Sequence, residues 1–485
     1  MTGRLRLRNI LTALLCVASS AAYAHSFGTP YILPIPFWMY VYGCAGTLVV
    51  TFAVLGYFVG ASAGPRPIRV REVPISGLLA LVGRWLLVLL RASALACLAI
   101  TILSGIIGTD DPSQNIGMTL FWVVFLLGFA YLTLLIGDLY ALINPWKLLL
   151  AGIERLGLNL TTPRLIYPSW LGAWPAFIFY LALVWIELFI PSSPSTLSIL
   201  LGTYSAITFC AAAAFGKEIW LEQADFFSVY FRVIGLMSPV AYTETQNGHF
   251  TIQVRPPFSG AVNVRPQHAG LVMFVLFMLS ATAYDGIYDT QLWTALYWRN
   301  LLAIFQPLWG SDLAAAQSML MNGFLVYRKA GLVLFPFIYL SFYLLALLGT
   351  RVLVRSAPPL RSLALDFCYS LMPIAFAYNF IHYYTFLVSQ AVALPWLLSD
   401  PFGFDWNLFN LPDTMGPATL KMGVIWHTQV AILLIGHIVS VAVAHHVAMR
   451  TFATQRAVII SQLPLLVLMV GYTSIGLWIL TLPLG

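Results

Sequence analysis

Long runs of apolar residues restrict the fold of this chain more than any other feature. A helix that crosses the hydrocarbon core of a bilayer needs about 20 largely apolar residues. On that criterion the sequence predicts spans at residues 37–60, 79–107, 118–143, 170–190, 197–215, 269–287, 331–349, 363–394, 424–447 and 458–482. Only 8% of the 485 residues are charged, which excludes an ordinary soluble domain. We therefore predict an all-α, polytopic membrane helix bundle of about ten transmembrane helices.

Residues 1–24 have the layout of a cleaved signal peptide. A basic start is followed by an apolar run at residues 10–17 and by Ala22-Tyr23-Ala24, a sequence that fits signal peptidase. Cleavage after Ala24 would make His25 the first mature residue, whose α-amine and imidazole suit copper. Residues 25–485 are then expected to form a single transmembrane domain.

The basic residues predict the orientation of the spans. Of the 24 Lys and Arg residues, three lie in the signal peptide and Arg91 lies inside the second span, which leaves 20. With the mature N-terminus outside, 16 of these 20 fall on the inner side, and the outer four are Arg299, Arg328, Lys329 and Lys421. Cytoplasmic loops hold such an excess, so we expect a bacterial inner-membrane protein with both termini in the periplasm. The charges form no basic face, which argues against a nucleic-acid partner.

Three connecting segments are long enough to hold structure of their own. The inner segment, 216–268, begins with a helical pattern at 217–236 and continues into turn signals around alternating residues, which predicts a small cytoplasmic hairpin. The outer segment 288–329 carries tryptophan-rich amphipathic stretches, which predict interfacial helices. A second outer loop, 399–421, holds aspartates among prolines and glycines.

Carboxylates near the spans are the first candidates for chemistry, because ionisable groups inside a bilayer are costly and mark functional sites. Glu187 lies near the outer end of the fourth span and Asp285 near that of the sixth. Either could be a catalytic base or a metal ligand, or an ordinary carboxylate at a helix end. Asp138 is expected to cap the turn after the third span. Spacings of four and three predict that three more acids share one helical face: Glu218, Glu222 and Asp225.

Two histidines are predicted to lie at equal depth. His382 is 12 residues inward from residue 394, and His437 is 13 residues inward from residue 424. Neighbouring antiparallel helices could therefore place both imidazoles on one divalent metal, zinc or another transition metal, or on haem as the less favoured cofactor. His427 is a third candidate ligand, nearer the surface. The alternative for each histidine is a hydrogen bond to a neighbouring helix.

Several short motifs resemble those of a known group of proteins. They are His25-Ser26-Phe27-Gly28, Gly137-Asp138, Tyr284-Asp285-Gly286, His382-Tyr383 and Gly436-His437. Together they resemble the multi-pass bacterial membrane proteins identified as fenitrothion hydrolase subunits. Many of those relatives continue with Ala-His-Asp where this chain has Ala444-His445-His446.

The resemblance implies hydrolysis of a lipophilic organophosphorus triester, with cleavage of the P–O aryl bond to nitrophenol and dialkyl thiophosphate, and a second protein subunit. Metal at His382 and His437, with Glu187 or Asp285 as a third ligand or base, would suit that reaction. Two other classes stay open: a transporter of a small solute, proton or metal, and a haem- or copper-related membrane partner without catalysis of its own. Walker and HExxH motifs are absent from the sequence.

Overall fold

The structure, a computed structural model, describes residues 36–59, 70–74, 76–244, 250–301, 313–412 and 421–482. The predicted signal peptide and His25 lie outside these ranges. Nine helical segments among the described residues are long and apolar enough to cross a membrane. Their helices are α2 (Phe37–Val54) with η2 (Leu55–Val59), α3 (Gly77–Ile107), α4 (Ile116–Met118) with η4 (Thr119–Gly128) and α5 (Phe129–Ile136), α9 (Pro194–Phe215), α13 (Ala269–Tyr288), α16 (Leu313–Leu353), α17 (Leu360–Phe367) with η7 (Cys368–Leu371) and α18 (Met372–Ser399), α19 (Met422–Thr451) and α20 (Gln455–Leu480).

The predicted all-α polytopic bundle is confirmed, and the chain is a multi-pass membrane protein. The remaining predicted span corresponds to α8 (Trp174–Phe189), which has 16 residues. At 1.5 Å per residue it extends roughly 24 Å, less than the roughly 30 Å of a bilayer core. Large apolar side chains also cover the outside of the bundle, for example Leu78, Leu79 and Val467, which suits lipid better than water.

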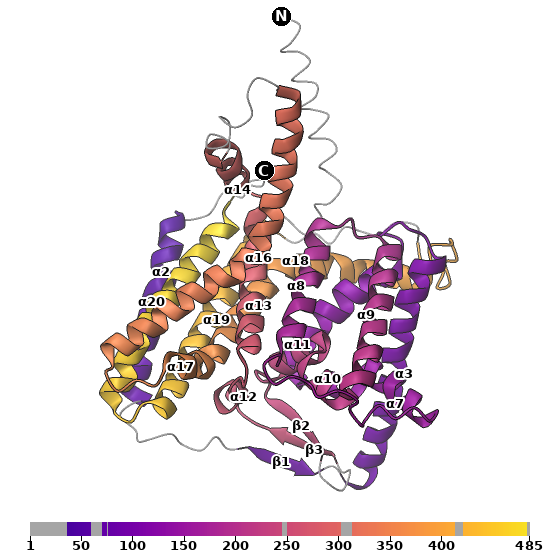
Figure 1. Ribbon diagram of the computed structural model, residues 1–485, viewed down its shortest axis with the longest axis horizontal. Helices are drawn as coiled ribbons and strands as arrows, with labels where there is room; N and C mark the ends of the chain where they lie inside the picture. The colour runs from indigo at the N-terminus through magenta and orange to yellow at the C-terminus, as the bar shows by residue number, and fades with distance from the viewer. Residues whose placement is uncertain are drawn as a thin grey trace, which may run out of the picture.

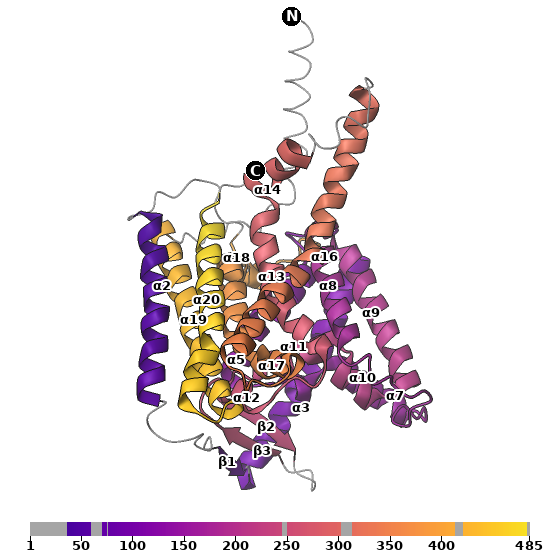
Figure 2. The same ribbon diagram turned by 60° about the vertical axis from the view of Figure 1, so that its left-hand side comes forward.

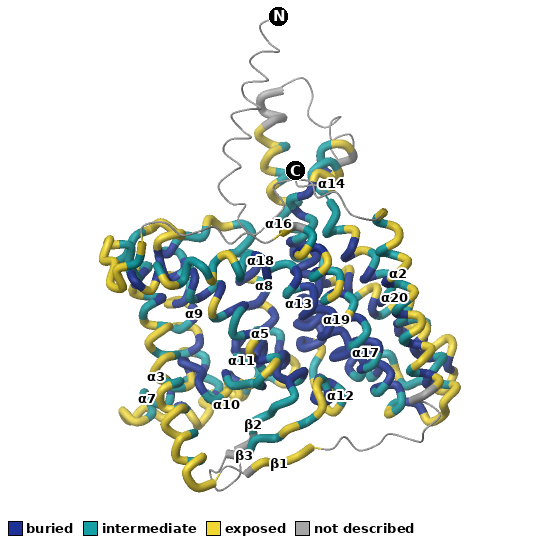
Figure 3. The backbone as a smooth tube through the Cα atoms, turned by 180° about the vertical axis from the view of Figure 1, so that it is seen from behind, coloured by how far each residue is buried: buried dark blue, intermediate teal, exposed yellow. Residues whose placement is uncertain are grey.

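Helix α13 is the centre of the bundle. Of its most apolar 18-residue window, 89% is buried, and α13 packs against α8, α16, α18 and α20. Figures 1 and 2 show α2, α19 and α20 on one side of it and α3, α7 (Pro145–Arg155) and α9 on the other. The buried part of the chain runs through α13 and α19, while α3 is largely exposed (Figure 3). Charged residues on α13 therefore have protein, and not lipid, around them.

Close contacts and hydrogen bonds join four of the helices: α16, α18, α19 and α20. The Thr350 hydroxyl donates to the Ser461 carbonyl at 2.7 Å, which links α16 to α20. The Tyr378 hydroxyl donates to the Tyr472 carbonyl at 2.5 Å and links α18 to α20. A Cβ at Gly436 would lie 2.5 Å from the Cβ of Ala377, so only glycine permits this approach of α18 and α19. Such small residues and interhelical hydrogen bonds are the usual means of packing helices in membranes.

A three-stranded antiparallel sheet lies at one end of the bundle (Figure 1). Strands β2 (Val240–Glu244) and β3 (Phe250–Val254) form the predicted hairpin, with Val240 opposite Val254. The third strand, β1 (Arg71–Pro74), comes from the connection between α2 and α3 and pairs with β3. A four-residue strand was too short to predict from the sequence. The short helix α12 (Ser259–Asn263) follows the hairpin.

The helical stretch predicted at 217–236 is broken into two helices. The chain forms α10 (Lys217–Gln223), breaks at Ala224 and Asp225, and continues as α11 (Phe226–Gly235). Eight of the ten residues of α11 are buried, and the helix packs on α5, α6 (Tyr140–Ile143) and α8. Its aromatic side chains make α11 part of the core. This burial was not predicted, because α11 is too short to be recognised as a membrane span.

Two other boundaries also differ from prediction. The third span ends at Ile136, not 143, because Gly137 adopts φ +91°; a Cβ there would lie 2.4 Å from the Val240 carbonyl oxygen. The expected interfacial segment at 313–329 is the first part of α16, which extends beyond the neighbouring helices (Figure 1). In the rest of that segment the chain forms α14 (Gln291–Ala295) and η5 (Leu296–Leu301), and their place at the membrane interface stays a prediction.

Candidate functional site

Four polar residues from three helices meet inside the bundle. They are Glu187 of α8, Asp285 of α13, and His382 and Tyr383 of α18, and we name them the carboxylate cluster. The Nε2 atom of His382 lies 2.6 Å from Oδ2 of Asp285. The Tyr383 hydroxyl lies 2.9 Å from Oε1 of Glu187 and 3.2 Å from Oδ2 of Asp285. Both predicted carboxylates and one predicted histidine are thus brought together.

The packing of the helices explains why the cluster forms. Glu187 and Asp285 each occupy the last turn of their helix, and α13 packs against both α8 and α18. The side chain of Asp285 is 4% exposed and that of His382 is 11% exposed. Charges so far from water persist only when they are paired or hydrogen-bonded. The His382–Asp285 pair meets this requirement.

The Tyr383 hydroxyl limits how hydrogen bonds are shared between the two carboxylates of the cluster. A hydroxyl has one hydrogen, so it can donate to only one of the two carboxylates at a time. Because His382 already contacts Asp285, the simplest arrangement has Tyr383 donating to Glu187. Tyr383 was missed as a site residue, although it follows His382 directly; a tyrosine adjacent to a histidine inside an apolar span was the available signal.

A tyrosine-rich interior continues from the cluster toward α11. Tyr180 lies two turns before Glu187 on α8, and its ring centroid lies 6.0 Å from that of Tyr230 on α11. Farther along, the Tyr131 hydroxyl lies 3.3 Å from Oδ1 of Asn379, one turn before Tyr383 on α18. The cluster is therefore bordered by groups that can accept and donate hydrogen bonds.

His437 does not share the level of His382. The Gln429 amide donates to the Ile381 carbonyl at 3.0 Å, and Gly436 contacts Ala377. Facing positions in an antiparallel pair change in opposite directions, so the residue of α19 level with His382 is near Thr428. His437 is then about nine residues deeper, roughly 13 Å along the axis. The expectation of equal depth assumed that residues 394 and 424 are level, but these contacts place residue 424 level with about residue 386.

The other predicted metal ligands contact their own helix. Nδ1 of His437 lies 2.8 Å from the Leu433 carbonyl, and its ring packs against Tyr378 with centroids 6.1 Å apart. His427 is exposed, and its Nδ1 lies 2.6 Å from the Gly423 carbonyl. Since a carbonyl only accepts, both Nδ1 atoms carry the hydrogen. Across the described ranges, no group of three His, Cys, Asp or Glu residues is arranged to hold a metal ion.

Glu218, Glu222 and Asp225 do not share one face, because the chain breaks before Asp225. Asp225 is fully buried as the N-cap of α11: it accepts from the Ser228 amide at 2.9 Å and from the Tyr204 hydroxyl. Burial raises the pKa of Asp225. Glu222 is exposed. These three carboxylates are therefore not a single site.

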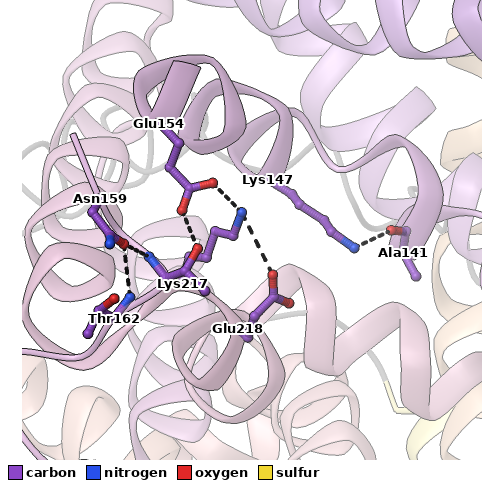
Figure 4. Close-up of polar contacts among 8 residues, drawn as sticks. Ala141, Lys147, Glu154, Asn159, Thr162, Lys217 and Glu218 are labelled. Atoms are coloured by element: carbon purple, nitrogen blue, oxygen red, sulfur yellow. Dashed lines mark hydrogen bonds and ion pairs between the residues drawn. The ribbon is translucent and has the colours of Figure 1, made fainter. Parts of the chain in front are cut away.

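Glu218 belongs to a peripheral charged group (Figure 4). Lys217 forms ion pairs with Glu154 and, at 3.8 Å, with Glu218. The hydrogen bond from Lys217 lowers the pKa of Glu154, to which the Thr161 hydroxyl also donates at 2.6 Å. This group joins the start of α10 to the end of α7, and its position at the surface fits a structural role.

Asp138 caps the turn after the third span, as expected. Its Oδ1 accepts from the Ala141 amide at 3.1 Å, and burial raises its pKa to about 6. Asn144 then caps α7 by accepting from the Lys147 amide at 3.1 Å. Arg91, the basic residue inside the second span, donates from Nε to the Leu142 carbonyl at 2.9 Å, so its charge is directed at the end of α6, where carbonyls lack helical partners.

Comparisons of the chain with protein-family models, with curated proteins and with solved structures found no match.

Proposed function

We propose that the chain is a membrane-bound hydrolase of neutral organophosphorus triesters, of the fenitrothion type, with the carboxylate cluster as its acid–base centre. The observation that supports this is the Tyr383 hydroxyl between two carboxylates, one of which is paired with His382. The cluster combines a hydrogen-bonded carboxylate that can take a proton with a neighbouring ion pair. The choice of substrate rests on the motif resemblance.

In the proposed reaction Glu187 is the general base. It takes one proton from a water molecule whose oxygen attacks phosphorus, and the P–O aryl bond breaks as nitrophenolate leaves with the bonding electrons. The second proton of the water is lost to solvent from the dialkyl thiophosphate. His382, held by Asp285, presents positive charge where negative charge develops on the phosphorus substituents. Tyr383 orients Glu187 by donating a hydrogen bond to it. Glu187 then releases the proton to solvent, which regenerates the base. Nitrophenolate is a stable anion and needs no acid to leave.

A divalent metal would polarise the phosphoryl or thiophosphoryl group and lower the pKa of its bound water to about 7. The predicted ligands do not fit one metal ion in this structure: the register of α18 and α19 separates His382 from His437, and His427 is exposed. No step of the proposed reaction therefore involves a metal. Zinc or another transition metal, and haem, stay predictions that metal and haem analysis of the purified protein would test.

The setting suits a lipophilic substrate. The chain spans the membrane many times and its outer surface is apolar, so an uncharged triester dissolved in the bilayer can reach it without entering water. We propose a location in the bacterial inner membrane with periplasmic termini, from the distribution of Lys and Arg. A second protein subunit is part of the same proposal.

Hydrolysis in ¹⁸O-water tests the proposed reaction. Membranes that contain the full chain should release nitrophenolate from fenitrothion, with ¹⁸O in the dialkyl thiophosphate and none in the nitrophenol. Glu187→Gln should lower the rate at least 100-fold, whereas Glu222→Gln, at an exposed glutamate of α10, should leave it unchanged. Label in the nitrophenol, or equal rates for the two variants, would contradict the proposal.

A proton-coupled transporter is the second candidate. Charged groups shared among α8, α13 and α18 favour it, because carboxylates and histidines inside bundles commonly relay protons. Proteoliposomes that contain the purified chain would then acidify internally when a substrate gradient is imposed, without releasing any hydrolysis product. Such acidification, together with no nitrophenolate release, would favour transport over hydrolysis.

A further inference from the structure

Tyr140 is far in the sequence from the carboxylate cluster, and it lines a cavity of about 210 Å³. The cavity lies between α3, η4, α6 and α7, and none of Glu187, Asp285, His382 and Tyr383 lines it. From α3 it is lined by residues at helical spacing, including Leu90, Ala94 and Leu98. These form one stripe of a helix whose opposite side, with Leu89, faces outward.

The opposite wall is aromatic. Phe121, Phe125 and Phe129 follow one another at intervals of four along and just after η4, and all three line the cavity with Tyr140 and Trp146. Their rings are held from behind: Tyr140 packs on Phe231 with centroids 4.7 Å apart, and Trp146 stacks on Phe227 at 5.1 Å. The wall is thus preformed. η4 is a π-helix of 10 residues, and π-helical turns occur frequently at functional sites.

Among the residues that the structure describes, the Tyr140 hydroxyl has no hydrogen-bond partner, although its residue is only 1% exposed. Buried hydroxyls nearly always have partners, because an unsatisfied donor is costly. Two other polar groups of the lining are already engaged: the Thr101 hydroxyl donates to the Cys97 carbonyl at 2.8 Å, and the Trp146 ring nitrogen donates to the Ser205 hydroxyl at 2.8 Å. The lining also includes Ser93, which is exposed on α3. Tyr140 therefore offers a buried, unpaired donor within a largely apolar, aromatic space.

We propose that this cavity binds a neutral aromatic molecule that carries a hydrogen-bond acceptor and enters from the lipid beside α3. The aromatic wall stacks the ring, and Tyr140 donates to the acceptor. No charged residue lines the cavity, which excludes an anionic or cationic ligand. The site is separate from the proposed catalytic centre and does not depend on hydrolase activity.

Two probes of similar shape test this binding: nitrobenzene, which has an acceptor, and isopropylbenzene, which has none. Binding to the full chain in nanodiscs is measured by equilibrium dialysis against empty nanodiscs. Tyr140→Phe should weaken nitrobenzene binding about five- to tenfold and leave isopropylbenzene binding unchanged. Ala94→Phe, which fills the cavity, should abolish the binding of both probes. Leu89→Phe, a matched change on the exposed side of α3, should affect neither.

The proposal is overturned if Ala94→Phe binds nitrobenzene as tightly as the wild-type chain does. It is also overturned if Tyr140→Phe binds each of the two probes as tightly as the wild-type chain does. So would the absence of nitrobenzene binding by the wild-type chain above the empty-nanodisc background. If Ala94→Phe does not fold, Leu98→Phe blocks the same stripe of α3 and replaces it. Tyr140→Phe loses an unpaired hydroxyl, so its melting temperature without probe should not fall.

Discussion

Replacing Tyr383 by phenylalanine removes the hydroxyl that lies 2.9 Å from Glu187 and 3.2 Å from Asp285. The ring and its packing stay. A hydroxyl donates one hydrogen bond at a time, so the loss is that of one bond to a carboxylate, about 1.5–3 kcal/mol, and not twice that amount. Thermal unfolding of the purified chain in detergent, followed by circular dichroism, measures the loss.

Tyr472→Phe is the matched control for that measurement. Tyr472 is 4% exposed and its hydroxyl has no hydrogen-bond partner within the described part of the chain, so its removal should cost nothing. A double-mutant cycle of Tyr383→Phe with Glu187→Gln isolates the bond between those two side chains. Equal stabilities of Tyr383→Phe and Tyr472→Phe, with no coupling in the cycle, would refute the hydroxyl's role in the carboxylate cluster.

Two further predictions concern residues outside the spans. Asp225→Ala removes the N-cap of α11 and leaves the Tyr204 hydroxyl unpaired. It should lower the free energy of unfolding in detergent by about 2–4 kcal/mol, and Glu222→Ala should lower it by less than about 0.5 kcal/mol. Equal losses in the two variants would contradict the buried cap. The raised pKa of Asp138, about 6 against 3.8, means that the folded state binds more protons, so this group's contribution to stability is greatest below pH 3.8 and falls as the pH rises toward 6. Relative to Asp138→Asn, the wild-type chain should therefore lose melting temperature between pH 5 and pH 7, and parallel pH profiles would contradict this.

Much of the fold follows from hydropathy, because a membrane helix must be apolar over a fixed length. The prediction failed where polar or short segments find partners inside the protein. Arg328 and Lys329 suggested the edge of a span, yet Arg328 pairs with Asp289 and its guanidinium lies 4.7 Å from the Tyr288 ring centroid, so α16 continues through both residues. α11 is buried by its aromatic side chains although it is too short to span.

The candidate site was predicted only in part, and the reason is related. Glu187, Asp285 and His382 could be selected because ionisable residues in apolar helices are rare. Which of them meet depends on the relative heights of helices, and hydropathy does not fix height to within a turn. His382 pairs with Asp285 and does not lie level with His437. The contact of Gly436 with Ala377 sets this register of α18 and α19. Counting from predicted helix ends could not give that register.

The proposed reaction depends on His382 and not on His437, and one comparison tests this most directly. Fenitrothion hydrolysis is measured in membranes that hold equal amounts of the wild-type chain, His382→Gln and His437→Gln. We predict that His382→Gln lowers nitrophenolate release at least 100-fold, while His437→Gln, at a buried ring that contacts its own helix, keeps the rate within about threefold of the wild-type value. Loss of activity in His437→Gln with full activity in His382→Gln would contradict the proposal.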